Sequence, residues 1–326
     1  MIVLGIETSC DETASAVSED GKILSSFIST QKIHKKYGGV VPEIASREHD
    51  KILNQMVFDT LNDSKKSISD IDGIAVTQGP GLTGTLLSGV CFAKGLSLGL
   101  NIPIIGINHL EAHIFANFLS DPKLKFPFIC LLVSGGHTQL WHVEGLRKYK
   151  LLGETRDDAA GEAFDKGARI LGLGYPGGPE IEKNAKMGDQ DSIKFPRPLM
   201  KHKNYEFSFS GLKTALLYYV NDGANKKTSD IAASYQYAIV EVLISKLKLA
   251  VENMNCDTCV IAGGVAANEL LRNIVRKFLP NTYVIFPEIS LCTDNAAMVA
   301  YLGELYLNSG EKTAIDFKVY PNMKLV

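Results

Sequence analysis

Residues 2–13 read Ile-Val-Leu-Gly-Ile-Glu-Thr-Ser-Cys-Asp-Glu-Thr, an apolar run followed by a polar turn. Alternating residues at 14–17 and a second apolar run at 23–28 come next, with an Asp-Gly pair at 20–21 between them. This pattern predicts three short strands joined by tight turns.

The same unit occurs again at residues 126–152. An apolar run at 126–133 leads into the turn Ser-Gly-Gly-His-Thr at 134–138, and further strands are expected at 139–143 and 149–152. Two copies of one supersecondary unit indicate two similar lobes that enclose a cleft. Short hairpins also resemble one another by chance, which is the alternative interpretation.

Helices and strands alternate outside these two copies, so each lobe is expected to be α/β. Helices are predicted at 42–62, 82–98, 159–171, 229–253, 268–279 and 295–308, and strands at 73–77, 102–107, 259–262 and 283–286. Ser229 is expected to cap its helix. Residues 187–209 hold several prolines, phenylalanines and lysines, and are predicted to be an inserted loop near the cleft.

We expect an N-terminal lobe at residues 1–105 and a C-terminal lobe at 106–326, with the final helix or tail free to pack back on the first lobe. The 326 residues suffice for two domains.

Composition indicates where the protein works and what it binds. A net charge of −2 argues against a global basic field for nucleic acid. Six cysteines in so long a chain are no disulfide framework, which indicates a reducing cytosol. Met1 leads into a strand and the longest uncharged run, 73–93, contains Gly-Pro-Gly, so a cytoplasmic protein without signal peptide or membrane span is predicted.

Two histidines in residues 107–113, Ile-Asn-His-Leu-Glu-Ala-His, form a candidate metal site. His109 and His113 lie four residues apart, so both rings leave one face of a helix and can reach one ion. Glu111 falls on the far side, whereas a zinc protease places its glutamate directly after the first histidine. The spacing thus predicts a metal site without protease chemistry, and the alternative is a pair of surface histidines.

Acidic residues elsewhere could complete this site. Asp294 precedes the last predicted helix and could be a third ligand, although taken alone this position favours a plain helix cap. Asp11 and Glu12 lie in the first turn and are expected to face the cleft.

Three glycine-rich turns, at 134–136, 175–178 and 262–264, could bring backbone N–H groups close to a phosphate. None fits the Rossmann or Walker pattern, and each alone could be a plain turn. Their grouping in one half of the chain favours a nucleotide cleft. Asp165 and Lys166 lie on a predicted helix nearby, where either could be an ordinary surface charge.

Two further patterns carry weaker signals. Cys256 and Cys259 form one CxxC, but no second ligand pair is spaced for a structural zinc site. Basic residues cluster in the inserted loop and near residue 35, where they are either solvated or available to a phosphate backbone: Lys194, Arg197, Lys201 and Lys203, and Lys32, Lys35 and Lys36.

Five motifs in this order resemble one known family: Gly5–Thr13, Gly79–Leu82, His109–His113, Leu132–Thr138 and Gly263–Asn268. They closely resemble the universal tRNA threonylcarbamoyl-adenosine family, whose bacterial branch is called TsaD. The match spans the whole chain. It implies an α/β fold of two duplicated lobes of the actin/Hsp70/sugar-kinase (ribonuclease H-like) type, with a central nucleotide cleft.

The resemblance also implies a reaction and a site. The threonylcarbamoyl group of threonylcarbamoyl-AMP passes to the exocyclic amine of adenosine 37 in tRNAs that read codons beginning with A. One divalent metal ion, iron or zinc, is held by the residues matching His109, His113 and Asp294. The family often has aspartate at the position of Glu182. The residues implied to hold the adenylate are Leu132, Val133, Ser134, Gly135, Gly136, Asp165, Gly178, Glu182 and Asn268.

The mixed anhydride is already activated, so no protein nucleophile is needed, but the adenine amine must lose a proton. Asp11 or Glu12 is the hypothetical acceptor. The resemblance implies four partners besides the metal: tRNA, a TsaB-like paralogue that pairs through the N-terminal lobe, a TsaE-like ATPase, and a TsaC-type enzyme that supplies the adenylate.

Two other functions remain open at this point. An ATP-dependent small-molecule kinase of the same fold would need magnesium and a catalytic carboxylate instead of a two-histidine metal site. A non-catalytic nucleotide-dependent scaffold would be expected to lack both the histidines and the Ser-Gly-Gly turn.

Overall fold

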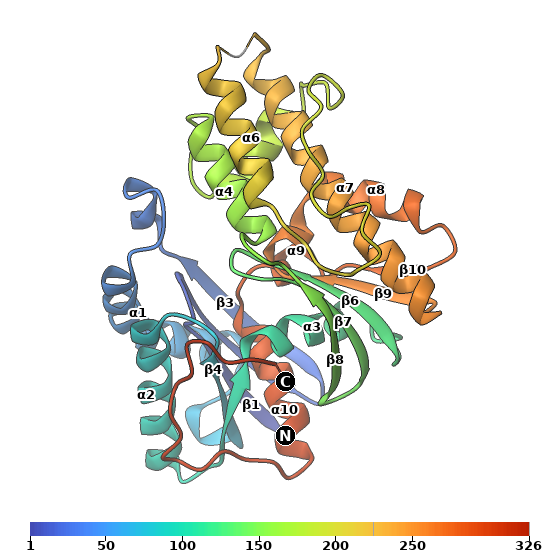
Figure 1. Cartoon of the computed structure of the whole chain (residues 1–326). Helices are drawn as coiled ribbons and strands as arrows, with labels where there is room; N and C mark the ends of the chain where they lie inside the picture. Colours follow the sequence, from blue (N-terminus) through green and yellow to red (C-terminus); the bar gives the residue numbers. More distant parts are fainter. Residues whose placement is uncertain (224, 326) are drawn as a thin grey trace. The chain divides into compact units, whose positions relative to one another are not determined.

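The structure, a computed structural model, describes residues 1–223 and 225–325 and divides into two compact units (Figure 1). Unit 1 comprises Met1–Pro122 and Glu288–Val326, and unit 2 comprises Lys123–Pro287. The division expected at 105/106 falls inside a strand, β5 (Ile104–Asn108), whose backbone hydrogen bonds tie it to the first sheet. The observed boundaries at 122/123 and 287/288 lie outside all helices and strands of the described chain.

Unit 1 is built on a five-stranded mixed sheet with the order β3-β2-β1-β4-β5. The first three strands form an antiparallel meander, and β4 and β5 run parallel to β1. Its strands are β1 (Ile2–Glu7), β2 (Glu12–Glu19), β3 (Lys22–Thr30), β4 (Gly73–Gly79) and β5.

Unit 2 repeats this sheet strand for strand. Its order is β8-β7-β6-β9-β10, with an antiparallel meander followed by two parallel strands. Its strands are β6 (Phe128–Val133), β7 (Thr138–Gly145), β8 (Lys148–Glu154), β9 (Thr258–Ala262) and β10 (Tyr283–Ile285). The predicted duplication is therefore confirmed, because both meanders pair in the same way and each is extended by parallel strands.

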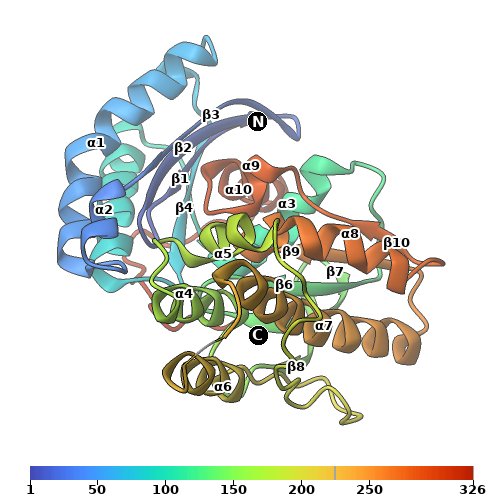
Figure 2. The same cartoon turned by 90° about the horizontal axis from the view of Figure 1, so that it is seen from above.

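Helices cover both faces of the unit 1 sheet (Figure 2). On one face Leu4 and Ile6 of β1 pack against α1 (Pro42–Asp63) and α2 (Thr83–Leu100). On the other face Ala14 and Ala16 pack against the small residues of α10 (Ala296–Asn308), which also contacts α3 (His109–Ser120). The shorter helices of this unit are η1 (Lys32–Lys36), η2 (Ile68–Asp70) and α9 (Ile289–Cys292).

The C-terminal segment after α10 lies against the parallel strands of unit 1. Thr313 N donates to Ile104 O at 2.8 Å, and Tyr320 N donates to Gln78 O at 3.0 Å. Near its end, Lys324 O accepts from Asn108 Nδ2 at 3.0 Å. The segment thus reaches the residue directly before the two histidines.

In unit 2 the long helix α7 (Thr228–Met254) is largely buried and packs against β6, α4 (Ala160–Ile170), α5 (Gly177–Ala185) and α8 (Glu269–Phe278). Helix α6 (Ser210–Asn221) packs against α4, and the 3-10 helix η3 (Gly264–Ala267) lies beside the ends of β6 and β9. Residues 187–209 form the predicted irregular loop, with only an isolated bridge at Phe207. Lys246 of α7 fixes this loop by donating to the carbonyl oxygens of His202 and Asn204 at 2.9 and 2.7 Å.

Two features of unit 2 differ from the sequence-based expectations. Helix α5 was not predicted, because it begins with Gly-Gly-Pro, which is typical of a turn. Helix α6 was missed although Leu212, Leu216 and Val220 have helical spacing. Ser229 is not the cap of α7: Lys227 occupies the cap position, and Ser229 lies inside the first turn.

Helix α2 is long and apolar enough to cross a membrane by length and composition alone, and a third of it is buried. Its buried face packs against α1 and β4. Such helices also occur at the cores of soluble proteins, so this property by itself assigns no membrane location.

Gly5 is a position where the close packing of β1 against α10 excludes a side chain. A Cβ added there would lie 2.6 Å from Ala300 N and 2.7 Å from Ala296 O. We expect Gly5→Ala to lower the free energy of unfolding by about 1–3 kcal/mol, measured by urea denaturation, because the backbone of α10 must shift. Gly95→Ala is the control: it meets nothing within 4 Å on an exposed part of α2 and should stabilise by up to about 1 kcal/mol. An unchanged midpoint for Gly5→Ala would contradict the packing described.

Candidate functional site

The two histidines are placed by the start of helix α3. Asn108, the last residue of β5, caps the helix, since its Oδ1 accepts from Leu110 N at 2.9 Å and from Glu111 N at 3.2 Å. This cap satisfies two backbone donors at the helix start. His109 and His113 therefore lie about one turn apart at the start of the helix and present their rings on one side, as predicted.

Asp294 meets both rings. Its Oδ1 lies 3.3 Å from His109 Nε2 and 3.2 Å from His113 Nε2, and the ring centroids are 4.6 Å apart. The three ligand atoms lie within 4.8 Å of one another. Two imidazole nitrogens and one carboxylate oxygen converging on one point form a donor set that suits iron or zinc.

The alternative roles for these residues are excluded by their surroundings. His113 is buried, and the His109 side chain is 11% exposed, so they are not a pair of surface histidines. Asn295 caps α10, with its Oδ1 accepting from Met298 N at 3.0 Å. The Asp294 carboxylate is therefore left to the histidines. Glu111 points elsewhere, as predicted, and its carboxylate bonds to the Tyr306 hydroxyl.

A second carboxylate holds the opposite side of the His109 ring. Glu7, fully buried at the end of β1, accepts from His109 Nδ1 at 3.0 Å. Burial acts to lower the pKa of His109, but Asp294 and Glu7 outweigh burial and raise this pKa well above its usual value. Burial acts to raise the pKa of Asp294, but the neighbouring His109 outweighs burial and holds this pKa far below its usual range.

The turn with the two other acidic residues lies in the same unit and is fixed by helix α1. The buried His49 lies 2.9 Å from Cys10 O through Nε2 and 2.7 Å from Thr13 Oγ1 through Nδ1. These contacts hold residues 10–13 against α1. Burial raises the pKa of Glu12 well above its usual value, and the carboxylates of Asp294 and Asp11 raise it further. Glu12 is thus within the electrostatic influence of Asp294, one of the three convergent side chains.

Unit 2 brings two of the predicted glycine turns together. Ser134 O accepts from Gly161 N at 3.2 Å, which sets the turn at 134–136 against the start of α4. Gly263 has a φ of +89°, and a Cβ there would lie 2.4 Å from Val133 O. Only glycine allows β9 and β6 to end so close together.

Helix α5 connects the remaining residues implied to hold the adenylate. At its start, Gly177 N donates to Asp165 Oδ1 at 2.7 Å, which sets Asp165 beside Gly178. Further along, Glu182 Oε1 accepts from Glu269 N at 2.6 Å, next to Asn268. Burial raises the pKa of Glu182.

Asn268 also has a structural role that the sequence did not suggest. Its Oδ1 accepts from Leu271 N at 3.0 Å and caps α8, and its Nδ2 donates to Gln236 Oε1 at 3.1 Å. A ligand that uses this amide must share atoms that are already hydrogen-bonded.

The weaker sequence patterns lie apart from these groups. Cys256 and Cys259 are buried free thiols, and burial raises the pKa of Cys259 to about 12. Arg197 is engaged internally, donating to Glu241 at 2.8 Å, and is not free for a phosphate. Lys194, Lys201 and Lys203 of the inserted loop are exposed.

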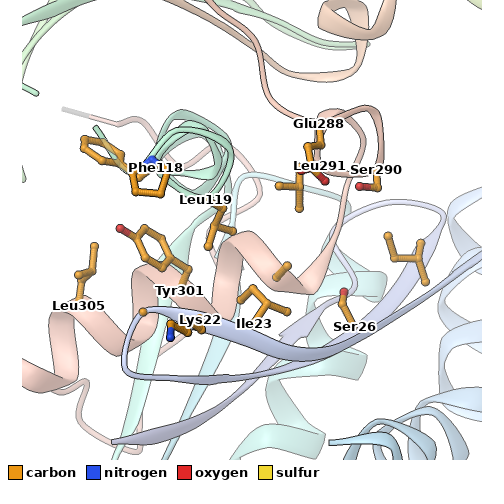
Figure 3. Close-up of a pocket in the computed structure, with 14 residues that line it drawn as sticks. Lys22, Ile23, Ser26, Phe118, Leu119, Glu288, Ser290, Leu291, Tyr301 and Leu305 are labelled. Carbon is orange, nitrogen blue, oxygen red and sulfur yellow. The ribbon is translucent and has the colours of Figure 1, made fainter. Parts of the chain in front are cut away.

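Unit 1 contains an apolar hollow of about 680 Å³ that was not predicted (Figure 3). Side chains from β3, α3 and α10 line it, among them Ile23, Phe118 and Tyr301. None of the three convergent ligands is part of its lining. The hollow is formed where elements distant in sequence meet, so no local pattern marks it.

Solved structures establish the fold class. The chain superposes on HypF of T. kodakarensis with a TM-score of 0.64 at 16% identity, covering 94% of this chain and 48% of that one. It also superposes on component A of the (R)-2-hydroxyglutaryl-CoA dehydratase of Acidaminococcus fermentans, with a TM-score of 0.58 at 15% identity and coverages of 95% and 100%. With its two repeated sheets, the chain therefore has the actin/Hsp70/sugar-kinase fold.

Sequence relatives establish the family. A family model described as TsaD, tRNA N6-adenosine threonylcarbamoyltransferase, matches residues 22–301. Enzymes of this name from Thermosipho africanus and Desulfitobacterium hafniense are 53% and 52% identical, over 100% and 92% of this chain and 100% and 91% of their own lengths. The chain belongs to this family, and it is a transferase that modifies adenosine in tRNA. Neither the kinase nor the scaffold alternative receives support from these relatives.

The three convergent side chains give a direct test of metal binding. We expect Asp294→Ala to abolish stoichiometric metal in the purified protein, measured by inductively coupled plasma mass spectrometry, because two imidazoles alone bind an ion weakly. Cys256→Ala should retain the metal content of the parent chain. Parental metal content in the Asp294→Ala protein would show that the ion is held elsewhere.

Proposed function

We propose that the chain takes the threonylcarbamoyl group from threonylcarbamoyl-AMP and transfers it to the exocyclic amine of adenosine 37 in tRNAs that read codons beginning with A. The observation that carries this proposal is the convergence of His109, His113 and Asp294 on one point, in a member of a transferase family. The two glycine turns that lie together in unit 2 support an adenylate as the donor, because backbone N–H groups in such turns can bind a phosphate.

His109, His113 and Asp294 would hold one divalent ion, iron or zinc. Such an ion supplies Lewis-acid polarisation of carbamate and phosphate oxygens. The three side chains leave coordination positions for substrate, since a structural site would require a fourth protein ligand. Glu111, bonded to Tyr306, is unable to serve as a protease-type base.

The adenylate is assigned to unit 2. The backbone N–H groups of Gly135 and Gly136 would contact its phosphate, as in an anion nest, whereas Ser134 N donates to His137 O at 2.8 Å within the turn. Asp165 and Glu182 would hold the ribose hydroxyls, and Gly178 would leave room for the sugar beside them. Asn268 and the small residues before it would contact the base. Leu132 and Val133 end the strand that carries the turn.

In the transfer step, the adenosine N6 attacks the carbamoyl carbon, the bond from that carbon to the phosphate oxygen breaks, and AMP leaves. One N6 proton must go to a base. We assign this proton to Glu12, with Asp11 as the alternative. Burial and the neighbouring carboxylates of Asp294 and Asp11 raise the pKa of Glu12, which makes its ionised carboxylate more basic than an exposed one and supports the assignment.

We infer the partners from the family and from the apolar residues exposed on unit 1. With a net charge of −2, the chain is expected to bind tRNA weakly alone, assisted by the exposed lysines of the inserted loop. Helices α1 and α2 expose large apolar residues, including Phe58 at 59% and Leu98 at 67%. We propose that they pair with a TsaB-like paralogue, and that a TsaE-like ATPase and a TsaC-type adenylate supplier complete a cytoplasmic system.

Reconstitution tests the reaction. The chain is mixed with its TsaB-like and TsaE-like partners, tRNA and threonylcarbamoyl-AMP, and the nucleosides are analysed by mass spectrometry. We expect threonylcarbamoyl-adenosine at position 37. Unmodified adenosine, in a mixture where the Thermosipho africanus relative is active, would contradict the proposal.

The same mixture tests the proton acceptor. Glu12→Gln should lower single-turnover transfer by about 10²–10⁴-fold while adenylate binding is retained, because only proton removal is lost. Glu144→Gln, an exposed carboxylate in unit 2, is the control. Full transfer by Glu12→Gln together with a loss in Asp11→Asn would reassign the role to Asp11.

A charged substitution on α2 tests the proposed partner surface. We expect Leu98→Asp to abolish the heterodimer with the TsaB-like paralogue in size-exclusion chromatography, because a desolvated carboxylate at an apolar interface is costly. Met187→Asp is the matched control, since this residue of unit 2 is 89% exposed. A heterodimer that forms equally with both variants would exclude the α2 surface.

A further inference from the structure

Glu7 is a residue of unit 1 to which the proposed metal and adenylate sites assign no role. It is fully buried at the end of β1, and it makes hydrogen bonds with both oxygens. Oε1 accepts from Ser9 N at 2.5 Å. Oε2 accepts from Thr77 Oγ1 at 2.6 Å and from His109 Nδ1 at 3.0 Å.

We propose that Glu7 is a positioning residue that fixes the tautomer and the orientation of the His109 ring, so that Nε2 is presented to the metal ion. An ionised carboxylate is an acceptor only, so the nitrogen that faces it must carry a proton. With Nδ1 protonated, the lone pair of a neutral ring lies on Nε2, the atom 3.3 Å from Asp294. The inference rests on the proposed metal centre.

The two histidines differ in this respect. His109 has a carboxylate behind its ring, whereas His113 Nδ1 is buried with no hydrogen-bond partner among the described residues. Glu7 therefore acts on one ligand of the pair. A carboxylate behind a ligating histidine typically changes metal affinity by 10–100-fold when it is replaced.

The surroundings of Glu7 make one substitution especially informative. In Glu7→Gln, the amide oxygen must take the place of Oε1, because Ser9 N–H needs an acceptor there. The NH₂ group then faces His109 Nδ1 and donates to it. The ring is driven to the tautomer with a proton on Nε2, so the nitrogen that faces Asp294 has no free lone pair.

The test is zinc affinity of the full chain, stripped of metal and titrated with Zn²⁺ against a chromophoric chelator. We expect Glu7→Gln to weaken zinc binding by about 10–100-fold. Glu111→Gln is the matched control, because this buried glutamate on α3 bonds to Tyr306 and lies on the far side of the helix. It should bind within about twofold of the parent. Equal affinities for parent and Glu7→Gln would overturn the role of Glu7, and a parent chain without zinc affinity would overturn the metal proposal as well.

A double-mutant cycle separates positioning from a general structural effect. If Glu7 acts through His109, then Glu7→Gln should cause no further loss of zinc affinity in a His109→Ala chain. An undiminished loss in that background would show that Glu7 acts through the fold and overturn the proposal.

A measurement on the unmodified chain avoids any folding defect of the variants. In the zinc-loaded protein labelled with ¹⁵N-histidine, the His109 signals, assigned by their loss in His109→Ala, should show a protonated Nδ1 and a metal-bound Nε2. A protonated Nε2 or a metal-bound Nδ1 at His109 would overturn the proposal.

Discussion

The fully buried carboxylate of Glu7 and the partly buried carboxylate of Asp294 contact opposite nitrogens of the His109 ring, and Asp294 also contacts His113. Burying carboxylates away from water is costly unless they are paired and hydrogen-bonded. Here that cost is offset by imidazoles from α3 and by donors from β1 and β4. The arrangement joins the two ends of unit 1, because Asp294 comes from the segment that returns to it after unit 2. The chemistry of the site thus depends on unit 1 being completed by residues 288–326.

Each unit uses the same sheet for a different purpose. In unit 1 the end of β1 supplies Glu7, and the end of β5 leads into α3, the helix that carries the two candidate metal ligands. In unit 2 the ends of β6 and β9 carry glycine turns that adjoin through Gly263. A duplicated sheet offers the same strand ends twice, and the residues placed there decide which ligand each copy can hold.

Local sequence patterns correctly predicted those parts of the fold that depend on residues close together in the chain. The meanders, the parallel strands and the helical spacing of His109 and His113 follow from periodicities of two and 3.6. The sequence alone did not decide whether Asp294 is a metal ligand or a helix cap. Only the placed backbone shows that the neighbouring Asn295 makes the capping hydrogen bond. The contact of Glu7 with His109 spans 102 positions in the chain and has no local signal. The observed boundary at 122/123 also had no local marker. It lies after α3, which belongs to the first unit because it packs against α10, a helix distant in sequence.

The central claim is that one metal ion is held between the two α3 histidines and Asp294. Anomalous diffraction from a crystal of the purified chain, collected on both sides of the iron and zinc absorption edges, tests it directly. We expect one strong peak at about 2.0–2.2 Å from His109 Nε2, His113 Nε2 and a carboxylate oxygen of Asp294. A peak at Cys256 and Cys259, or the absence of any peak beside the histidines in metal-replete protein, would contradict the account.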